Sequence, residues 1–211
     1  MHDLLQGIHQ SIIEGNQRTT TETVQAALDA SLAPETILKE GMISAMAEVG
    51  QLFEEGEYFV PDMLLSARAM QSGLALLKPY LAQAEVKSMG RVAIGTVQGD
   101  WHDIGKNLVA IMLEGAGFEI TDLGTDVPPE KFVQSIGQGD FDILAMSALL
   151  TTTMTNMQAT IQALQEAGLR DRIKIIIGGA PVTESYARQI GADGYAPDAS
   201  RAVGLAKSML E

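Results

Sequence analysis

The sequence predicts a four-helix bundle followed by a Rossmann-like (flavodoxin-like), doubly wound sheet of five parallel strands. In the first 84 residues, apolar side chains recur at three- and four-residue steps, as they do in amphipathic helices. From residue 90 onward, short β-branched runs alternate with helical periodicity, which is typical of βα units. Between these parts, over 82–90, periodicity fades and polar residues gather. We therefore expect a helical domain over 1–84, a linker at 82–90 and an α/β domain over 90–211.

The four helices of the first part have boundaries that glycine, proline and a capping pattern indicate. Thr19 with Glu22 has the spacing of a capping box and is expected to start the second helix. Proline suits the first turn of a helix and glycine its end. On this basis the first helix ends near Gly15, the third runs from Pro34 to Gly56, and the fourth begins at Pro61 and ends near Pro79.

The second part contains five strand-like runs, each followed by a helical segment. Right-handed crossovers of this length place the strands parallel and put helices on both faces of the sheet. Strands are expected at 91–97, 118–123, 141–146, 173–177 and 194–196, and helices at 104–116, 128–137, 154–167, 182–190 and 199–210.

Composition excludes several classes of function. The 211 residues include no cysteine, which removes disulfides, thiolate metal sites and cysteine nucleophiles. Three histidines, His2, His9 and His102, are too few for a histidine-rich metal cage. A net charge of −13 without a basic stripe argues against nucleic acid as a partner. No signal peptide or membrane span is recognisable, so we expect a cytoplasmic protein that does not bind membranes.

Residues 99–105 follow the first predicted strand and are the strongest candidate for a functional loop. Open α/β sheets bind ligands at the carboxyl ends of their strands. At this end His102 lies between two carboxylates, Asp100 and Asp103, either of which could orient the imidazole ring. Gly105 would let the backbone pass close to a bulky ligand. A histidine in a loop is by itself more often a surface residue than a metal ligand, so the argument depends on this context.

Two further patterns follow the third and fourth strands at the same predicted edge. Ser147-Ala-Leu149 leads into the hydroxyl cluster 151–153, although Thr152 or Thr153 would also serve as an ordinary helix N-cap. Gly178-Gly179 follows the fourth strand, where a pair of glycines is usually only a tight turn. The glycines near the first strand form neither a dinucleotide fingerprint nor a Walker loop, and Ser147 lacks a nucleophile elbow.

Together these patterns resemble a known signature. Asp100-x-His102-x-x-Gly105, 41 intervening residues, Ser147-x-Leu149, 28 intervening residues and Gly178-Gly179 closely resemble the cobalamin-binding signature of methionine synthase and the corrinoid methyltransferase proteins. The stretch 50–70 resembles the helical cap that precedes this domain in the same proteins. Because the likeness covers nearly the whole chain without further domains, it implies a corrinoid protein of a three-component methyltransferase system.

The resemblance implies that cobalamin binds with its dimethylbenzimidazole base off the cobalt and with His102 as the lower cobalt ligand. Asp100 would hold the other ring nitrogen, and Thr153 stands where the family usually has the serine that completes this relay. Ser147 would meet the displaced base, Thr151 a nearby polar group, and Gly178-Gly179 would make room for the nucleotide tail. The other implied cofactor contacts are Gly99, Trp101 in place of an aliphatic residue, Asp103, Ile104, Gly105, Leu149, Ala199 and, from the helical cap, Phe53 and Val60.

The function implied by the resemblance is that of a methyl carrier whose cobalt cycles between Co(I) and methyl-Co(III). A substrate-specific methyltransferase would load the methyl group, a tetrahydrofolate- or thiol-dependent methyltransferase would remove it, and an ATP-dependent activator would rescue oxidised cobalt. Such a protein would not be catalytic alone. The alternatives are the cobalamin subunit of a mutase, a cobalamin-based sensor, and a flavodoxin-like domain without a cofactor. The sequence does not indicate whether methylamines, methanol, glycine betaine or methoxylated aromatics supply the methyl group.

Overall fold

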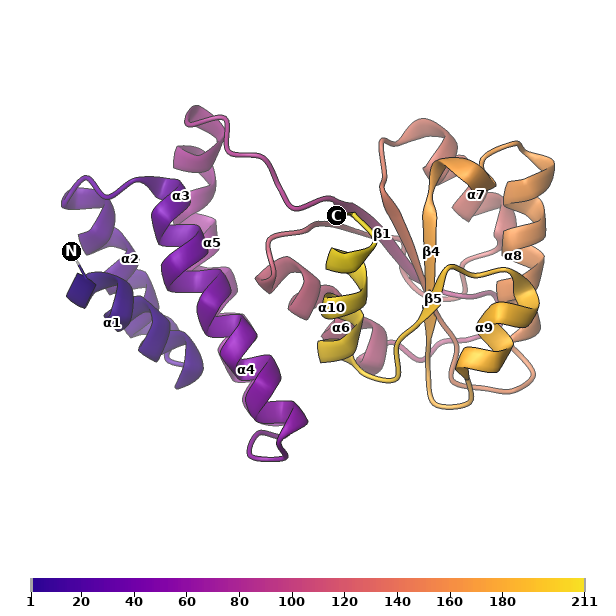
Figure 1. The fold of residues 1–211 in the computed structure, drawn as a ribbon, viewed down its shortest axis with the longest axis horizontal. Helices are drawn as coiled ribbons and strands as arrows, with labels where there is room; N and C mark the ends of the chain where they lie inside the picture. Colours follow the sequence, from indigo (N-terminus) through magenta and orange to yellow (C-terminus); the bar gives the residue numbers. More distant parts are fainter. Residues whose placement is uncertain (1, 211) are drawn as a thin grey trace. The chain divides into compact units, whose positions relative to one another are not determined.

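The computed structural model describes residues 2–210, which form two compact units. One contains residues 2–88 with 115–117, and the other contains residues 89–114 with 118–210. Figure 1 shows the first as helical and the second as a sheet covered by helices. The predicted fold class is therefore confirmed.

The helical unit is built from α1 (His2–Ile13), α2 (Gln17–Asp29), a long third helix and α5 (Val60–Gln83). The third helix is continuous through α3 (Pro34–Thr36), a π-helical segment η1 (Ile37–Ile43) and α4 (Ser44–Glu54). The π segment was not predicted, because a wider turn hardly changes the spacing of apolar residues. The helices bury a common apolar core that includes Ile8, Ile12, Val24, Ile37, Met42, Val49, Met63, Met70 and Leu77.

One predicted detail of these helices is wrong. The capping box at Thr19 and Glu22 is absent, because α2 begins three residues earlier than that pattern implied. Its N-cap is Asn16, whose side-chain oxygen accepts the backbone N–H of Thr19 at 3.1 Å. Asparagine caps helices as well as threonine does, so the local pattern offered two starts. The fourth helix does end near Pro79 as expected, since α5 continues only to Gln83.

The α/β unit contains a fully parallel sheet in the order β2-β1-β3-β4-β5. The strands are β1 (Arg91–Thr96), β2 (Glu119–Asp122), β3 (Ile143–Ser147), β4 (Lys174–Gly178) and β5 (Gly194–Tyr195). The helices are α6 (Ile104–Gly115), α7 (Pro129–Gln138), α8 (Thr155–Glu166), α9 (Glu184–Ile190) and α10 (Ala199–Ser208), and a short 3-10 turn, η2 (Arg170–Arg172), precedes β4. The expected boundaries differ from these by one or two residues, as is usual at fraying ends.

The helices lie on both faces of the sheet. One continuous core joins α7, α8 and α9 to the inner strands through Phe132, Met157, Ile161, Leu144 and Ile177, while α6 and α10 lie on the opposite face (Figure 1). The chain leaves β1 toward β2 on one side and then returns to place β3 on the other. The direction of winding thus reverses between β1 and β3, and ligands of such sheets bind at the carboxyl ends of these two strands.

Among residues 2–210, no helix combines the length and the apolar character that a membrane span requires.

Candidate cofactor site

His102 and Asp100 form a hydrogen-bonded pair in the loop after β1. The distance from His102 Nδ1 to Asp100 Oδ1 is 2.7 Å. The Asp100 carboxylate is fully buried, whereas about half of the His102 side chain is exposed. Of the two acids considered for this role, Asp103 instead accepts a hydrogen bond from Asn107 Nδ2 at 3.2 Å. Since a carboxylate only accepts, it favours the tautomer with the proton on Nδ1 and leaves the Nε2 lone pair free.

The buried carboxylate of Asp100 is held by donors from two loops. Oδ1 also accepts the backbone N–H of His102 at 3.1 Å, while Oδ2 accepts the N–H of Leu149 at 2.8 Å and the Thr153 hydroxyl at 2.7 Å. Burial by itself raises the pKa of Asp100, but the hydrogen bonds from Thr153, Leu149 and His102 outweigh it and hold the pKa well below its ordinary value. The side chain is therefore a permanent negative charge behind the imidazole.

Thr153 lies between the two loops and is not the helix cap that the sequence also allowed. Its hydroxyl donates to Asp100 Oδ2 and also lies 2.9 Å from the carbonyl oxygen of Leu150. The helix α8 starts only at Thr155, and neither Thr152 nor Thr153 occupies its N-cap position, which is Met154. A turn over residues 150–154 separates strand from helix, and this turn brings the hydroxyl back to the carboxylate.

The register of the sheet brings the three sequence motifs to one edge. Ser147, the last residue of β3, pairs with Thr96 of β1 on one side and with Gly178 of β4 on the other. The Thr96 hydroxyl in turn donates to the carbonyl oxygen of His102 at 2.9 Å. The motifs separated by 41 and 28 residues are thus neighbours in space.

The surface around His102 is apolar and open. Trp101 is 73% exposed and Ile104 is 76% exposed, and Leu149 and Leu150 are also exposed. A Cβ placed on Gly105 would meet no atom within 4 Å, so the space beside this loop is not filled by the protein. Exposed apolar side chains gathered at one place usually mark a binding surface.

Gly178, the last residue of β4, and Gly179, which follows it, are required by the packing of the chain itself. A Cβ on Gly178 would lie 2.9 Å from the carbonyl oxygen of Ala196, and one on Gly179 would lie 1.9 Å from that of Ala148. Gly179 also has a φ of +126°. The turn expected here is present, and it brings the backbones of neighbouring loops into close contact.

The remaining expected cofactor contacts lie in the turn before α8, in α10 and in the helical unit. Thr151 is exposed in the turn before α8, and Ala199 is buried in the first turn of α10. Phe53 and Val60 belong to the helical unit, where Phe53 is half-buried and Val60 is exposed. Neither side chain is fully buried in the core of the bundle. The neighbouring Phe59 is more exposed still, and the sequence pattern did not single it out.

The sequence also missed residues that hold the loop from outside it. Asn156 Nδ2 donates to the carbonyl oxygen of Gln98 at 2.7 Å, and Asp126 Oδ1 accepts the N–H of Gly99 at 2.7 Å. Both come from segments far away in sequence, and no periodicity or motif marks them. Lys106 lies in the first turn of α6, where no sequence pattern marks it, yet its side chain is only 2% exposed.

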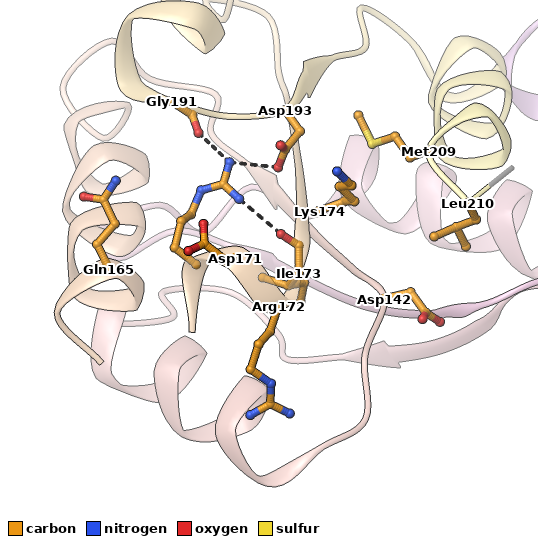
Figure 2. A pocket seen from close by; sticks show the side chains of 11 residues that line it. Asp142, Gln165, Asp171, Arg172, Ile173, Lys174, Gly191, Asp193, Met209 and Leu210 are labelled. Carbon is orange, nitrogen blue, oxygen red and sulfur yellow. Dashed lines mark hydrogen bonds and ion pairs between the residues drawn. The ribbon is translucent and has the colours of Figure 1, made fainter. Parts of the chain in front are cut away.

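A cavity of about 560 Å³ lies at the opposite, amino-terminal edge of the sheet (Figure 2). Arg170 lines it and donates to the carbonyl oxygens of Ile173 and Gly191 and to Asp193. The lining includes three cations, Arg170, Arg172 and Lys174, and three acids, Asp142, Asp171 and Asp193. The balanced charge and the location away from the carboxyl ends do not favour this cavity as the cofactor site.

Comparisons with known proteins agree with the geometry. Residues 90–204 and residues 4–78 each match a family model described as a B12 binding domain. Dimethylamine corrinoid protein 3 of Methanosarcina acetivorans is 42% identical over 98% of this chain and 97% of its own length. Trimethylamine corrinoid protein 1 of the same organism is 42% identical over 95% and 94%. The crystal structure of the methanol:cobalamin methyltransferase complex MtaBC from Methanosarcina barkeri matches with a TM-score of 0.88 and 32% identity, over 99% of this chain and 80% of that one.

The residues at the carboxyl edge fit this cofactor chemically. Within residues 2–210, no group of three or more His, Cys, Asp or Glu side chains could hold a metal ion. A metal at His102 must therefore arrive with most of its own ligands, as cobalt does in a corrin ring. The free Nε2, the apolar side chains and the unfilled space beside Gly105 suit a broad ring with one protein ligand. The chain belongs to the family of corrinoid proteins of methyltransferase systems, and its cofactor is cobalamin.

Proposed function

We propose that this protein is a methyl carrier that binds cobalamin base-off with His102 on the cobalt. When bound, the cofactor supplies a cobalt centre that accepts and donates a methyl group. The protein's own part is to bind the cofactor, fix the axial imidazole and control access to the cobalt. The observation that supports this best is the 2.7 Å contact between a half-exposed imidazole and a fully buried carboxylate.

Asp100 and Thr153 tune the imidazole in this proposal. The carboxylate accepts the proton of Nδ1, and its negative charge makes the ring a stronger electron donor through Nε2. The Thr153 hydroxyl, at 2.7 Å from Asp100 Oδ2, stabilises that charge in place of the serine common in the family. A threonine hydroxyl is the same donor as a serine hydroxyl, and its methyl group restricts the side-chain rotamer.

Other residues of the α/β unit would hold the rest of the cofactor. We assign Gly99, Trp101, Asp103, Ile104, Gly105 and Leu149 to the face below the corrin ring. The displaced base and its nucleotide arm would bind near Ser147, Thr151, Gly178, Gly179 and Ala199. At the two glycines the proposed contact is with backbone, since the space that a Cβ would take is occupied by the carbonyl oxygens of Ala196 and Ala148.

The helical unit would serve as a removable lid over the other face of the cofactor. Phe53 and Val60 have apolar surface available for this role, and we add Phe59, which the structure exposes next to them. Shielding by apolar groups protects a reactive centre from water, but the lid must move away for transfer. Residues 82–90 would then be the hinge.

Two methyltransferases and an ATP-dependent reductive activator are the partners in this proposal. The first methyltransferase would bring a methylated substrate, and the second would use tetrahydrofolate or a thiol as the acceptor. Relatives named for dimethylamine and trimethylamine are equally similar to this chain, at 42% identity. This supports our placing of substrate choice in the first methyltransferase and not in the carrier.

Fluorescence of Trp101 provides a direct test, because it is the sole tryptophan of the chain and adjoins His102. Adding hydroxocobalamin should quench its emission with a stoichiometry of one cofactor per chain. His102→Ala should weaken binding and change the visible spectrum of the bound cofactor, while His9→Ala, in the helical unit, should change neither. An unaltered spectrum and affinity in the His102 variant would refute the ligand assignment. Methyl transfer from methylcobalamin on the protein to an acceptor methyltransferase would distinguish a carrier from a mutase subunit or a sensor.

A further inference from the structure

Asp126, in the loop between β2 and α7, forms two hydrogen bonds with the loop that carries His102. Its side-chain Oδ1 accepts the N–H of Gly99 at 2.7 Å, and its own backbone N–H donates to the carbonyl oxygen of Asp100 at 2.9 Å. It adopts the left-handed conformation with φ of +53°, which costs free energy for any residue with a Cβ. A strained residue whose backbone and side chain both bind one loop indicates that the position of that loop matters.

The same segment holds the His102 loop at its other end. Asp122, at the end of β2, accepts a hydrogen bond from Lys106 Nζ at 2.5 Å, and Lys106 is buried in the first turn of α6. A buried ammonium at the positive end of a helix is unfavourable unless an acid offsets it. Between these contacts, the N–H of Thr96 donates to Gly124 and the N–H of Val127 donates to Thr96. Residues 122–127 thus span the His102 loop from Gly99 to Lys106.

These contacts help to fix the position and direction of the Asp100 side chain. Its carboxylate end is held from the other side by Leu149 and Thr153, but its backbone end is held by Asp126. The direction of a short side chain is fixed only when both ends are fixed. If the backbone at Gly99 and Asp100 moves, the carboxylate keeps its donors in the β3–α8 loop and turns away from His102.

We infer that Asp126 is a positioning residue that sets the tautomer and orientation of His102 through the backbone of Gly99 and Asp100. The inference rests on the proposed function, because it concerns how the cobalt ligand is prepared. It predicts that the imidazole is pre-oriented before any cofactor binds. A change at Asp126 should therefore be measurable in the protein without cobalamin.

Three substitutions separate the contributions of Asp126. Asp126→Asn keeps an acceptor and tolerates the left-handed conformation, Asp126→Gly keeps the conformation but loses the acceptor, and Asp126→Ala loses both. Asp140→Asn is the control, because this 97% exposed acid precedes β3 at the opposite edge of the sheet. Thermal unfolding of each apoprotein shows whether the fold survives, and Asp126→Gly should be the best-tolerated variant that lacks the acceptor.

The first measurement is ¹⁵N NMR of the imidazole nitrogens in the cofactor-free protein. The chain has three histidines, and the exposed His2 serves as an internal reference for a free ring. Wild type, Asp126→Asn and Asp140→Asn should hold His102 as the Nδ1–H tautomer. Asp126→Gly and Asp126→Ala should shift His102 toward the tautomer mixture of His2. If His102 in a folded Asp126→Gly protein is indistinguishable from wild type, the inference is wrong.

The second measurement uses added cob(II)alamin and the nitrogen splitting of its electron paramagnetic resonance signal. Loss of one hydrogen bond should lower the ratio of His-ligated to unligated cofactor roughly two- to tenfold in Asp126→Gly, with recovery in Asp126→Asn. An equal ratio in Asp126→Gly and in a wild type that shows nitrogen ligation would overturn the inference. Failure of the proposed function has a different signature: wild type would bind cobalamin without nitrogen ligation, while the NMR shift in Asp126→Gly would still support the positioning role.

Discussion

Replacing Asp100 by asparagine should convert His102 to a tautomer that cannot bind cobalt. Asp100 Oδ1 faces two donors of His102, and Oδ2 faces the N–H of Leu149 and the hydroxyl of Thr153. An amide has one oxygen and one NH₂ group, so one of these two sets of donors must face another donor. The fold is expected to remain intact, because the side chain keeps its size.

In Asp100→Asn, we expect His102 to change its tautomer so that two hydrogen-bond donors no longer face each other. The N–H of Leu149 belongs to a fixed backbone, whereas an imidazole changes tautomer by moving one proton. The asparagine oxygen should therefore take the place of Oδ2, and its NH₂ should donate to Nδ1 of His102. The ring proton then moves to Nε2, the nitrogen whose lone pair must bind the metal.

These contacts give the expected losses of stability and of cofactor affinity in Asp100→Asn. The backbone N–H of His102 loses its acceptor, which costs about 1 kcal/mol of unfolding free energy because the loop is partly exposed. Removing the partner that orients a metal-binding histidine weakens metal affinity roughly tenfold to a hundredfold. Cobalamin affinity should therefore fall much more than protein stability does.

The assay combines ¹⁵N NMR of the apoprotein with titration of Trp101 fluorescence by hydroxocobalamin. Asp100→Asn should show His102 as the Nε2–H tautomer and a bound cofactor without nitrogen ligation. Asp140→Asn provides the same change of charge at an exposed site and should behave as wild type. An unchanged Nδ1–H signal together with wild-type affinity would refute the reasoning.

Three further predictions concern neighbouring parts of the molecule. Thr153→Val removes a hydroxyl donor from the buried carboxylate and should lower unfolding free energy by roughly 1–2 kcal/mol. The pKa of the Asp100 carboxyl is lower in the folded state than in the unfolded state, so the stabilisation by its hydrogen bonds is present above the unfolded-state pKa. The loss of unfolding free energy in Thr153→Val, measured with urea, should therefore be constant between pH 7 and pH 4. A loss that vanished at pH 5 would contradict the depressed pKa. Gly179→Ala should prevent folding or lower thermal stability severely, since its Cβ would lie 1.9 Å from a backbone carbonyl oxygen. Gly105→Ala should leave the apoprotein as stable as wild type or more so, and it should weaken cobalamin binding. Equal thermal stability of Gly179→Ala and Gly105→Ala by calorimetry would contradict the predicted difference between these two glycines. Phe53→Ala should speed photolysis of bound methylcobalamin without abolishing binding, and a photolysis rate equal to that of wild type would argue against the lid.

The amino-acid sequence predicts the type of each part of the chain, but not every helix boundary. The spacing of apolar residues determined that the first part is helical and the second is α/β, because burial of a helix stripe or a strand leaves a period in the sequence. The start of α2 was misplaced because Asn16 and Thr19 are both good caps, and only packing chooses between them. The π segment at 37–43 was missed, because in so short a segment the wider turn hardly changes the spacing of apolar residues.

The sequence by itself determined which motifs make up the candidate site, and the tertiary structure decided how these motifs are held together. The spaced motifs around His102, Ser147 and Gly178 lie at strand ends, and the parallel order of the sheet makes strand ends neighbours. That Asp100 rather than Asp103 holds the ring depends on a turn of a few residues, for which the sequence offered both acids. The hydrogen bond from the Gly99 N–H to Asp126 joins residues 27 positions apart. A hydrogen bond between distant loops produces no periodic pattern in the sequence. Such contacts exist only after folding has brought the loops together.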